Sequence, residues 1–198
     1  MYELPHLQSL TKQIEILLNI LKTNTELMNI LEKARELEAP NWYIGAGAIA
    51  QTVWNYFHQF QSTQGIKDYD LVYFDPDTAY EAEDTFIQKG KSIFADVSHP
   101  VEIRNQARVH LWYKNHFGTD IAAHTCTEHA ITTWPTTATG IGVRLNSDNT
   151  FTVFSPFGLH DVLGMIVRPN KVKITEQIYL DKVNRWHAVW PMLQAMSW

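Results

Sequence analysis

Two aspartates separated by one residue, Asp68 and Asp70, open the most β-prone run of the chain, which extends to Phe74. Side chains two positions apart on a strand project from the same face, so both carboxylates point to one place. Two like charges about 4 Å apart repel by roughly 4 kcal/mol at an effective dielectric near 20. A divalent cation removes this repulsion, and Mg²⁺ binds one or two protein carboxylates together with water and phosphate. Asp68 and Asp70 are therefore candidate Mg²⁺ ligands.

A glycine-containing turn, Gly45-Ala46-Gly47, precedes the aspartates and separates an expected strand over 42–44 from an expected helix that runs to Phe60. The backbone amides of such a turn and the N-terminus of the following helix can approach phosphate closely. An Asp-x-Asp pair alone is more typical of a turn or a cap, and a glycine turn alone is weak evidence. Together they predict both halves of a triphosphate site.

Apolar periodicity predicts the elements that position these residues. Helical spacing over the first forty residues indicates two amphipathic helices, the second ending at Pro40. We also expect helices over 79–89, 105–113, 159–167 and 175–193, strands over 70–74 and 101–103, and a hairpin over 141–154. Thr125 and Glu128 form a capping-box pattern. The pattern predicts one α/β domain over residues 1–198, with a helical hairpin over 1–40 and a core over 41–198.

The run Ile44-Gly45-Ala46-Gly47-Ala48, followed by Lys67-Asp68-Tyr69-Asp70-Leu71-Val72, resembles the signature of the DNA-polymerase-beta-like nucleotidyltransferases. This superfamily includes CCA-adding enzymes and antibiotic nucleotidyltransferases. Residues 105–112, 134–139 and 156–159 resemble one bacterial family of it, formerly a domain of unknown function, so the resemblance extends from Trp42 to the C-terminus. It implies an α/β (α+β) core, a small mixed sheet with flanking helices, extended by N-terminal and C-terminal helices.

The resemblance also implies a third carboxylate on a neighbouring strand. Glu102, in the expected strand over 101–103, occupies the implied place, and Asp96 and Asp120 are the alternatives. Asp68, Asp70 and Glu102 would hold two Mg²⁺ ions, or Mn²⁺ instead, and catalyse in-line transfer of a nucleoside monophosphate with release of pyrophosphate. We take AMP as the transferred group because ATP is common. The hydroxyl or phosphate acceptor is not identified by the sequence.

Binding of a triphosphate requires cationic side chains and backbone donors. Where members of the superfamily have a glycine followed directly by Gly or Ser, this sequence has Gly-Ala-Gly-Ala. Backbone amides must therefore replace the hydroxyl that would contact the phosphate. Arg108 is equally compatible with bracing a helix, and Arg144 and Arg168 are further candidates. The residues that we expect to bind the nucleotide are Gly45, Ala46, Gly47, Lys67, Arg104, Asn105 and Arg108.

Composition limits the choice of partner and compartment. The 198 residues carry a formal net charge of -5, which does not favour a surface that coats nucleic acid. Cys126 is the only cysteine, and the N-terminus lacks a basic then apolar leader, so we expect a cytoplasmic protein. Apolar runs are interrupted well before the roughly 20 residues that span a bilayer. The expected partners are a nucleoside triphosphate and an acceptor, and the oligomeric state stays open.

Three other interpretations compete with this one. His124, Cys126 and His129 are competent zinc ligands, although a structural site requires a fourth and capping explains them as well. Tryptophans near the C-terminus would suit base stacking, but their helical spacing favours a core or a dimer contact. A non-catalytic nucleotide-binding or interaction module on the same fold would retain the carboxylates. Serine-hydrolase and Walker-type motifs are absent.

Overall fold

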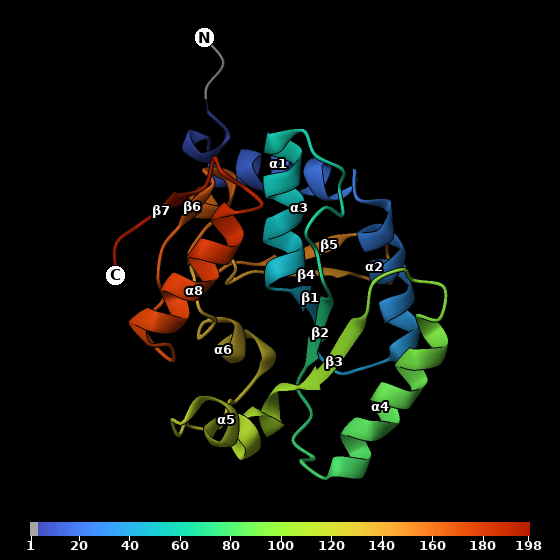
Figure 1. Ribbon diagram of the computed structural model, residues 1–198. Coiled ribbons are helices and arrows are strands. Elements are labelled where there is room, and N and C mark those ends of the chain that lie inside the picture. The colour runs from blue at the N-terminus through green and yellow to red at the C-terminus, as the bar shows by residue number, and fades with distance from the viewer. Residues whose placement is uncertain (1–3) are drawn as a thin grey trace.

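The computed structural model describes residues 4–198, so residues 1–3 of the expected N-terminal hairpin lie outside the described residues (Figure 1). The helices are η1 (Pro5–Leu7), α1 (Leu10–Leu21), α2 (Thr25–Leu37), α3 (Gly47–His58), α4 (Tyr80–Ile93), η2 (Gln106–Arg108), α5 (Val109–Phe117), α6 (Thr127–Ile131), α7 (His160–Leu163) and α8 (Glu176–His187). The strands are β1 (Tyr43–Gly45), β2 (Tyr69–Tyr73), β3 (Val101–Asn105), β4 (Gly142–Leu145), β5 (Phe151–Phe154), β6 (Ile166–Val167) and β7 (Gln194–Ala195). None of the described helices is long and apolar enough to cross a membrane.

The main sheet has five strands in the order β3-β2-β1-β4-β5. β2 and β3 are parallel and are connected through α4, whereas the remaining neighbours are antiparallel. β6 and β7 form a separate parallel pair. The expected mixed sheet with flanking helices is confirmed.

The two faces of the sheet have different chemistry because side chains alternate along each strand. Leu71 of β2, Ile103 of β3 and Ile44 of β1 lie on the face that joins the large hydrophobic core, together with α1, α2 and α3. Asp70 and Val72 of β2 lie on the other face. This second face carries only a small buried cluster, so it remains open to a pocket.

Three tryptophans fix α8 against α3. Trp54 of α3 contacts Trp186 of α8 and Trp190 edge-to-face, with ring centroids 5.3 and 5.4 Å apart. All three rings are buried, so Trp186 and Trp190 are core residues rather than an exposed stacking surface. In Figure 1, α8, α6 and α5 lie on the opposite side of β2 and β3 from α2 and α4. The tryptophan cluster thereby sets where α8 stands relative to the open face.

Three expected helices differ from those observed. Asn105 ends β3 instead of starting a helix, because its side chain bonds the loop at Asp75 and caps η2. The helix expected over 159–167 is the short α7, since residue 165 has a positive φ and the next two residues pair with β7. The helix expected over 175–193 ends at His187, and Pro191 follows within one turn. Cys126, rather than Thr125, caps α6.

Substitution of the buried Asn55 is expected to destabilise the fold and the loop that enters β2. Its Nδ2 donates to the carbonyls of Ser62 and Gln64 at 3.0 and 2.9 Å, and its Oδ1 accepts from Trp190 Nε1 at 2.7 Å. Asn55→Ala removes three hydrogen bonds at a site with 0% exposure, so urea denaturation should show a loss of roughly 2–4 kcal/mol. The exposed Gln61→Ala is the control. A loss below about 0.5 kcal/mol for Asn55→Ala would contradict this role.

Candidate active site

Strand register brings Asp70 and Glu102 side by side. Asp70 pairs with Glu102 across the parallel β2 and β3, and with Gly45 across the antiparallel β1 and β2. Asp68 lies two residues before Asp70, immediately upstream of β2. The charges of both Asp68 and Glu102 act on Asp70. All three residues expected to catalyse the reaction are therefore neighbours along the sheet.

The charge at Asp70 is unfavourable in the protein alone. Burial, followed by the negative charges of Asp68 and Glu102, raises the pKa of Asp70 to about 6, although Arg104 and Lys182 oppose this shift. Burial lowers the pKa of Lys182, and Arg185 lowers it further, whereas Asp70 and Asp68 raise it. The site thus concentrates negative charge that the two nearest basic side chains only partly balance.

Arg104 forms an ion pair with Glu102. The Arg104 guanidinium donates to Glu102 Oε2 through Nη2 at 2.5 Å and through Nε at 3.2 Å. Over residues 4–198, no three His, Cys, Asp or Glu side chains converge into a group able to hold a metal ion. Mg²⁺, however, usually takes only one or two protein carboxylates and completes its coordination with water and phosphate. The oxygen donors of Asp68 and Asp70, with their unbalanced charge, fit such an ion.

The turn between β1 and α3 is shorter and more strained than its glycines suggest. Gly45 belongs to β1 and Gly47 to α3, so Ala46 alone makes the turn, with φ 56 and ψ -130. A non-glycine residue at this conformation costs about 1–3 kcal/mol, and such strain clusters at functional sites. No side chain caps α3. Its first amides are therefore available to an anion.

The glycines of this turn make room for neighbouring side chains. A Cβ on Gly45 would lie 2.6 Å from the ring of Trp134 and 2.7 Å from the carbonyl oxygen of Ile141. A Cβ on Gly47 would lie 3.0 Å from Gln51 Nε2. Gly45 thus seats the Trp134 indole, which is a contact that the sequence did not suggest.

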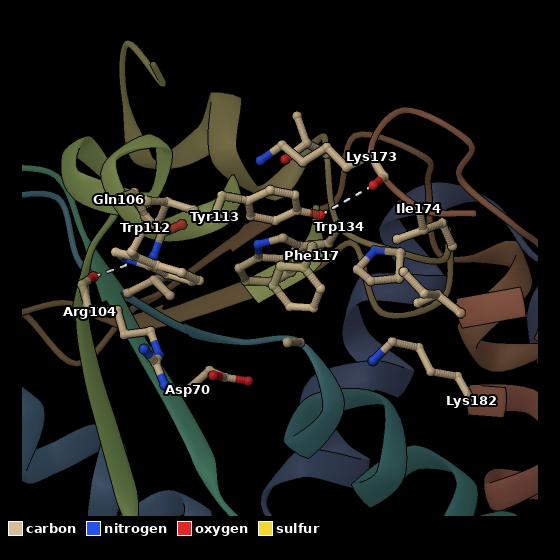
Figure 2. A pocket seen from close by; sticks show the side chains of 16 residues that line it. Asp70, Arg104, Gln106, Trp112, Tyr113, Phe117, Trp134, Lys173, Ile174 and Lys182 are labelled. Carbon is tan, nitrogen blue, oxygen red and sulfur yellow. Dashed lines mark hydrogen bonds between the residues drawn. The ribbon is translucent and has the colours of Figure 1, made fainter. Parts of the chain in front are cut away.

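A cavity of about 280 Å³ opens beside Asp70. Figure 2 shows Asp70, Arg104 and Lys182 along one side of this pocket and aromatic rings gathered on the other. A smaller hollow of about 150 Å³ is lined by Lys67, Asp68 and Arg185. Asp70 therefore lines a mainly apolar pocket and Asp68 lines a hollow with two cationic side chains, whereas Glu102 lines neither.

The basic side chains at the site differ in part from those expected. Of the basic residues that the sequence predicted to bind the nucleotide, Arg104 lines the pocket and Lys67 lines the hollow. Lys182 and Arg185 were missed by the sequence analysis. They come from α8, more than a hundred residues after the aspartates, and their spacing of three is the signal that both lie on one helix face.

Asn105 and Arg108 are directed away from the pocket. Asn105 follows Arg104 on β3 and so faces the opposite side, where its Nδ2 donates to the carbonyls of Asp75 and Asp77. Arg108 forms an ion pair with Glu83 at 2.8 Å and bonds the carbonyl of Thr78. Arg144 contacts the Tyr43 ring, and Arg168 pairs with Asp161. The last two arginines are likewise outside the lining of the pocket.

The candidate zinc ligands have other partners. Cys126 Sγ accepts from the backbone amide of His129, and His124 Nε2 lies 2.7 Å from Lys173 Nζ. Burial, and then the charge of Lys173, lowers the pKa of His124 to about 4. Cys126 thus caps α6, and the rings of His124 and His129 contact each other edge-to-face.

Residues 32–195 match a family of nucleotidyltransferases. The chain belongs to this nucleotidyltransferase family. The family and the fold support transfer of a nucleoside monophosphate, and enzymes of this kind generally use divalent metals.

The nucleotidyltransferase is also similar to a protein solved by NMR whose structure "reveals a CCA-adding enzyme head domain". The two share 26% sequence identity with a TM-score of 0.73, over 90% of this chain and 95% of the other. No curated protein sequence matches the chain.

Asp70→Asn is expected to stabilise the metal-free nucleotidyltransferase at pH 8. A pKa of about 6 means that folding favours the protonated carboxyl, so the cost of its charge is complete above pH 6 and disappears as the pH falls toward 4. Urea denaturation should show that the free energy of unfolding rises by roughly 1–2 kcal/mol at pH 8. This value is smaller than the pKa shift alone implies, because Asp70 is only half-buried and solvent screens its charge.

The control for this prediction is Asp84→Asn on α4, which should leave stability unchanged at both pH values. Equal stability of Asp70→Asn and the wild type at pH 8, or the same gain at pH 4 as at pH 8, would contradict the electrostatic account.

Proposed function

We propose that this nucleotidyltransferase transfers AMP from ATP to a hydroxyl or phosphate acceptor and releases pyrophosphate, with Asp68, Asp70 and Glu102 as its catalytic carboxylates. The observation that carries the proposal is the register of β1, β2 and β3, which aligns Gly45, Asp70 and Glu102 and places Asp70 in the lining of a pocket. The raised pKa of Asp70 supports it, because perturbed carboxyls concentrate at functional sites.

The divalent cations would be Mg²⁺, held by Asp68 and Asp70 and joined by Glu102 when Arg104 releases it. When bound, they neutralise phosphate charge and lower the pKa of the attacking hydroxyl. The unbalanced negative charge around Asp70 and its hard oxygen donors support this choice of metal.

The remaining groups would bind the triphosphate. Lys182 and Arg185 lie one turn apart on α8, where they flank Asp70 and Asp68 and would bind the phosphate oxygens. The uncapped start of α3, at Gly47, would donate backbone amides to the same group. Lys67 would extend this cationic surface from the adjacent hollow.

The acceptor oxygen would form a bond to the α-phosphorus as the bond from that phosphorus to the pyrophosphate oxygen breaks. If the acceptor is a hydroxyl, its proton must be taken up. Arg104 bonds only Oε2 of Glu102, which leaves Oε1 to accept this proton. Lys182 and Arg185 would stabilise the charge that develops on the departing pyrophosphate.

Transfer of radiolabel tests this function. The protein would be incubated with Mg²⁺ and [α-³²P]ATP together with separate RNA, protein and small-molecule fractions from a bacterial extract. We expect label in one fraction and stoichiometric pyrophosphate. The double variant Asp68→Asn, Asp70→Asn should reduce the rate of label transfer by at least about 100-fold, because several kcal/mol of transition-state stabilisation are lost.

Asp84→Asn, a carboxylate on α4 outside the pocket, should retain wild-type transfer. Label transfer that survives in the Asp68→Asn, Asp70→Asn double variant would contradict the assignment. Binding of ATP that depends on Asp70 without transfer to any fraction would instead support the non-catalytic module.

A further inference from the structure

The aromatic side of the pocket is not explained by phosphate or metal chemistry. Trp112, Tyr113 and Phe117 of α5 and Trp134 after α6 line it (Figure 2). Phe117 is 48% exposed, and Trp112 is also reached by solvent. Open aromatic rings gathered in a concave site are typical of a surface that a ligand covers. A flat ring that stacks on them is the ligand that these side chains suit.

One buried amide among these rings lacks a full set of partners. Gln106 is 5% exposed and lines the pocket. Its Nε2 makes one long hydrogen bond, 3.4 Å, to the carbonyl oxygen of Arg104. No donor in the described part of the chain reaches its Oε1. Oε1 is not enclosed by the protein and is accessible from the pocket, so a ligand that covers it without supplying a donor would leave it unsatisfied.

The charged side of the same pocket identifies which ligand carries the ring. Asp70, which we assign to the metal, and Lys182, which we assign to the nucleotide phosphates, line it together with Arg104 and with Ala46 at the start of α3. Only the ribose separates the α-phosphate of a nucleotide from its base. The pocket therefore has charged groups on one side and aromatic rings on the other, and one nucleotide has both a phosphate and a ring to meet them.

We propose that this pocket binds the nucleobase of the donor nucleotide. The base stacks on Trp112 and its aromatic neighbours, and an exocyclic amine of the base donates a hydrogen bond to Gln106 Oε1. Adenine carries such an amine, whereas hypoxanthine has at the same position a carbonyl oxygen, a second acceptor that would face Oε1. The inference rests on the proposed function and adds to it the residues that select the base.

Calorimetric binding of three ligands separates the contribution of the base from that of the phosphates. MgATP, MgITP and inorganic tripolyphosphate with Mg²⁺ would be titrated into the full chain without acceptor. We expect the wild type to prefer MgATP over MgITP by about tenfold, the effect of one unsatisfied buried acceptor. Trp112→Ala should weaken MgATP about 5- to 150-fold, the range for loss of one base stack, and leave tripolyphosphate unchanged.

Gln106→Leu tests selection of the amine and should abolish the preference for MgATP over MgITP, whereas Gln106→Glu, which keeps an acceptor oxygen, should retain it. Leu111→Ala, an exposed residue of α5 outside the pocket lining, is the matched control and should bind all three ligands as the wild type does. Circular dichroism would verify that each variant is folded.

Unchanged MgATP affinity in Trp112→Ala, or an unchanged ratio of MgATP to MgITP affinity in Gln106→Leu, would overturn the inference and assign the aromatic pocket to another ligand. Failure of the proposed function has a different result. In that case neither tripolyphosphate nor MgATP binds the wild type, or both bind equally well to Asp70→Asn.

Discussion

Electrostatic repulsion within the carboxylate row is the constraint on which the site depends. Register places Asp70 beside Glu102 and opposite Gly45, and Asp68 stands just before them. No rearrangement of side chains alone can remove Asp70 from its neighbours, because the pairing of β1, β2 and β3 holds their backbones. Arg104 of β3 balances part of this charge, and α8 supplies Lys182 from outside the sheet for the same purpose.

The opposite face of the sheet makes this arrangement rigid. Leu71 and Ile103 alternate with the carboxylates along their strands and are packed in the large core beneath α1, α2 and α3. A shift of register by one residue would bury the carboxylates and expose the core residues, so hydrophobic packing protects the geometry of the site. Trp54 similarly couples α3 to α8, which bring the turn and the basic side chains to the same pocket.

Local pattern was sufficient to predict the strands, because each follows from short-range spacing, whereas the mixed sheet and the place of Glu102 beside Asp70 were implied by the family resemblance. It failed for Asn105, because the boundary between β3 and η2 depends on hydrogen bonds to the distant loop at Asp75. Lys182 could not be predicted for the site because only the tertiary packing of α8 brings it there. The seating of Trp134 on Gly45 is equally a long-range contact.

The most direct measurement is a crystal structure of the protein with Mg²⁺ and an ATP analogue whose α,β-bridging oxygen is replaced by a methylene group. We expect the α-phosphate and a metal ion at Asp68 and Asp70, with Lys182 bound to the phosphate oxygens. A nucleotide bound elsewhere, with Asp68 and Asp70 free of metal and phosphate, would contradict the central claim that this carboxylate row is the site of nucleotidyl transfer.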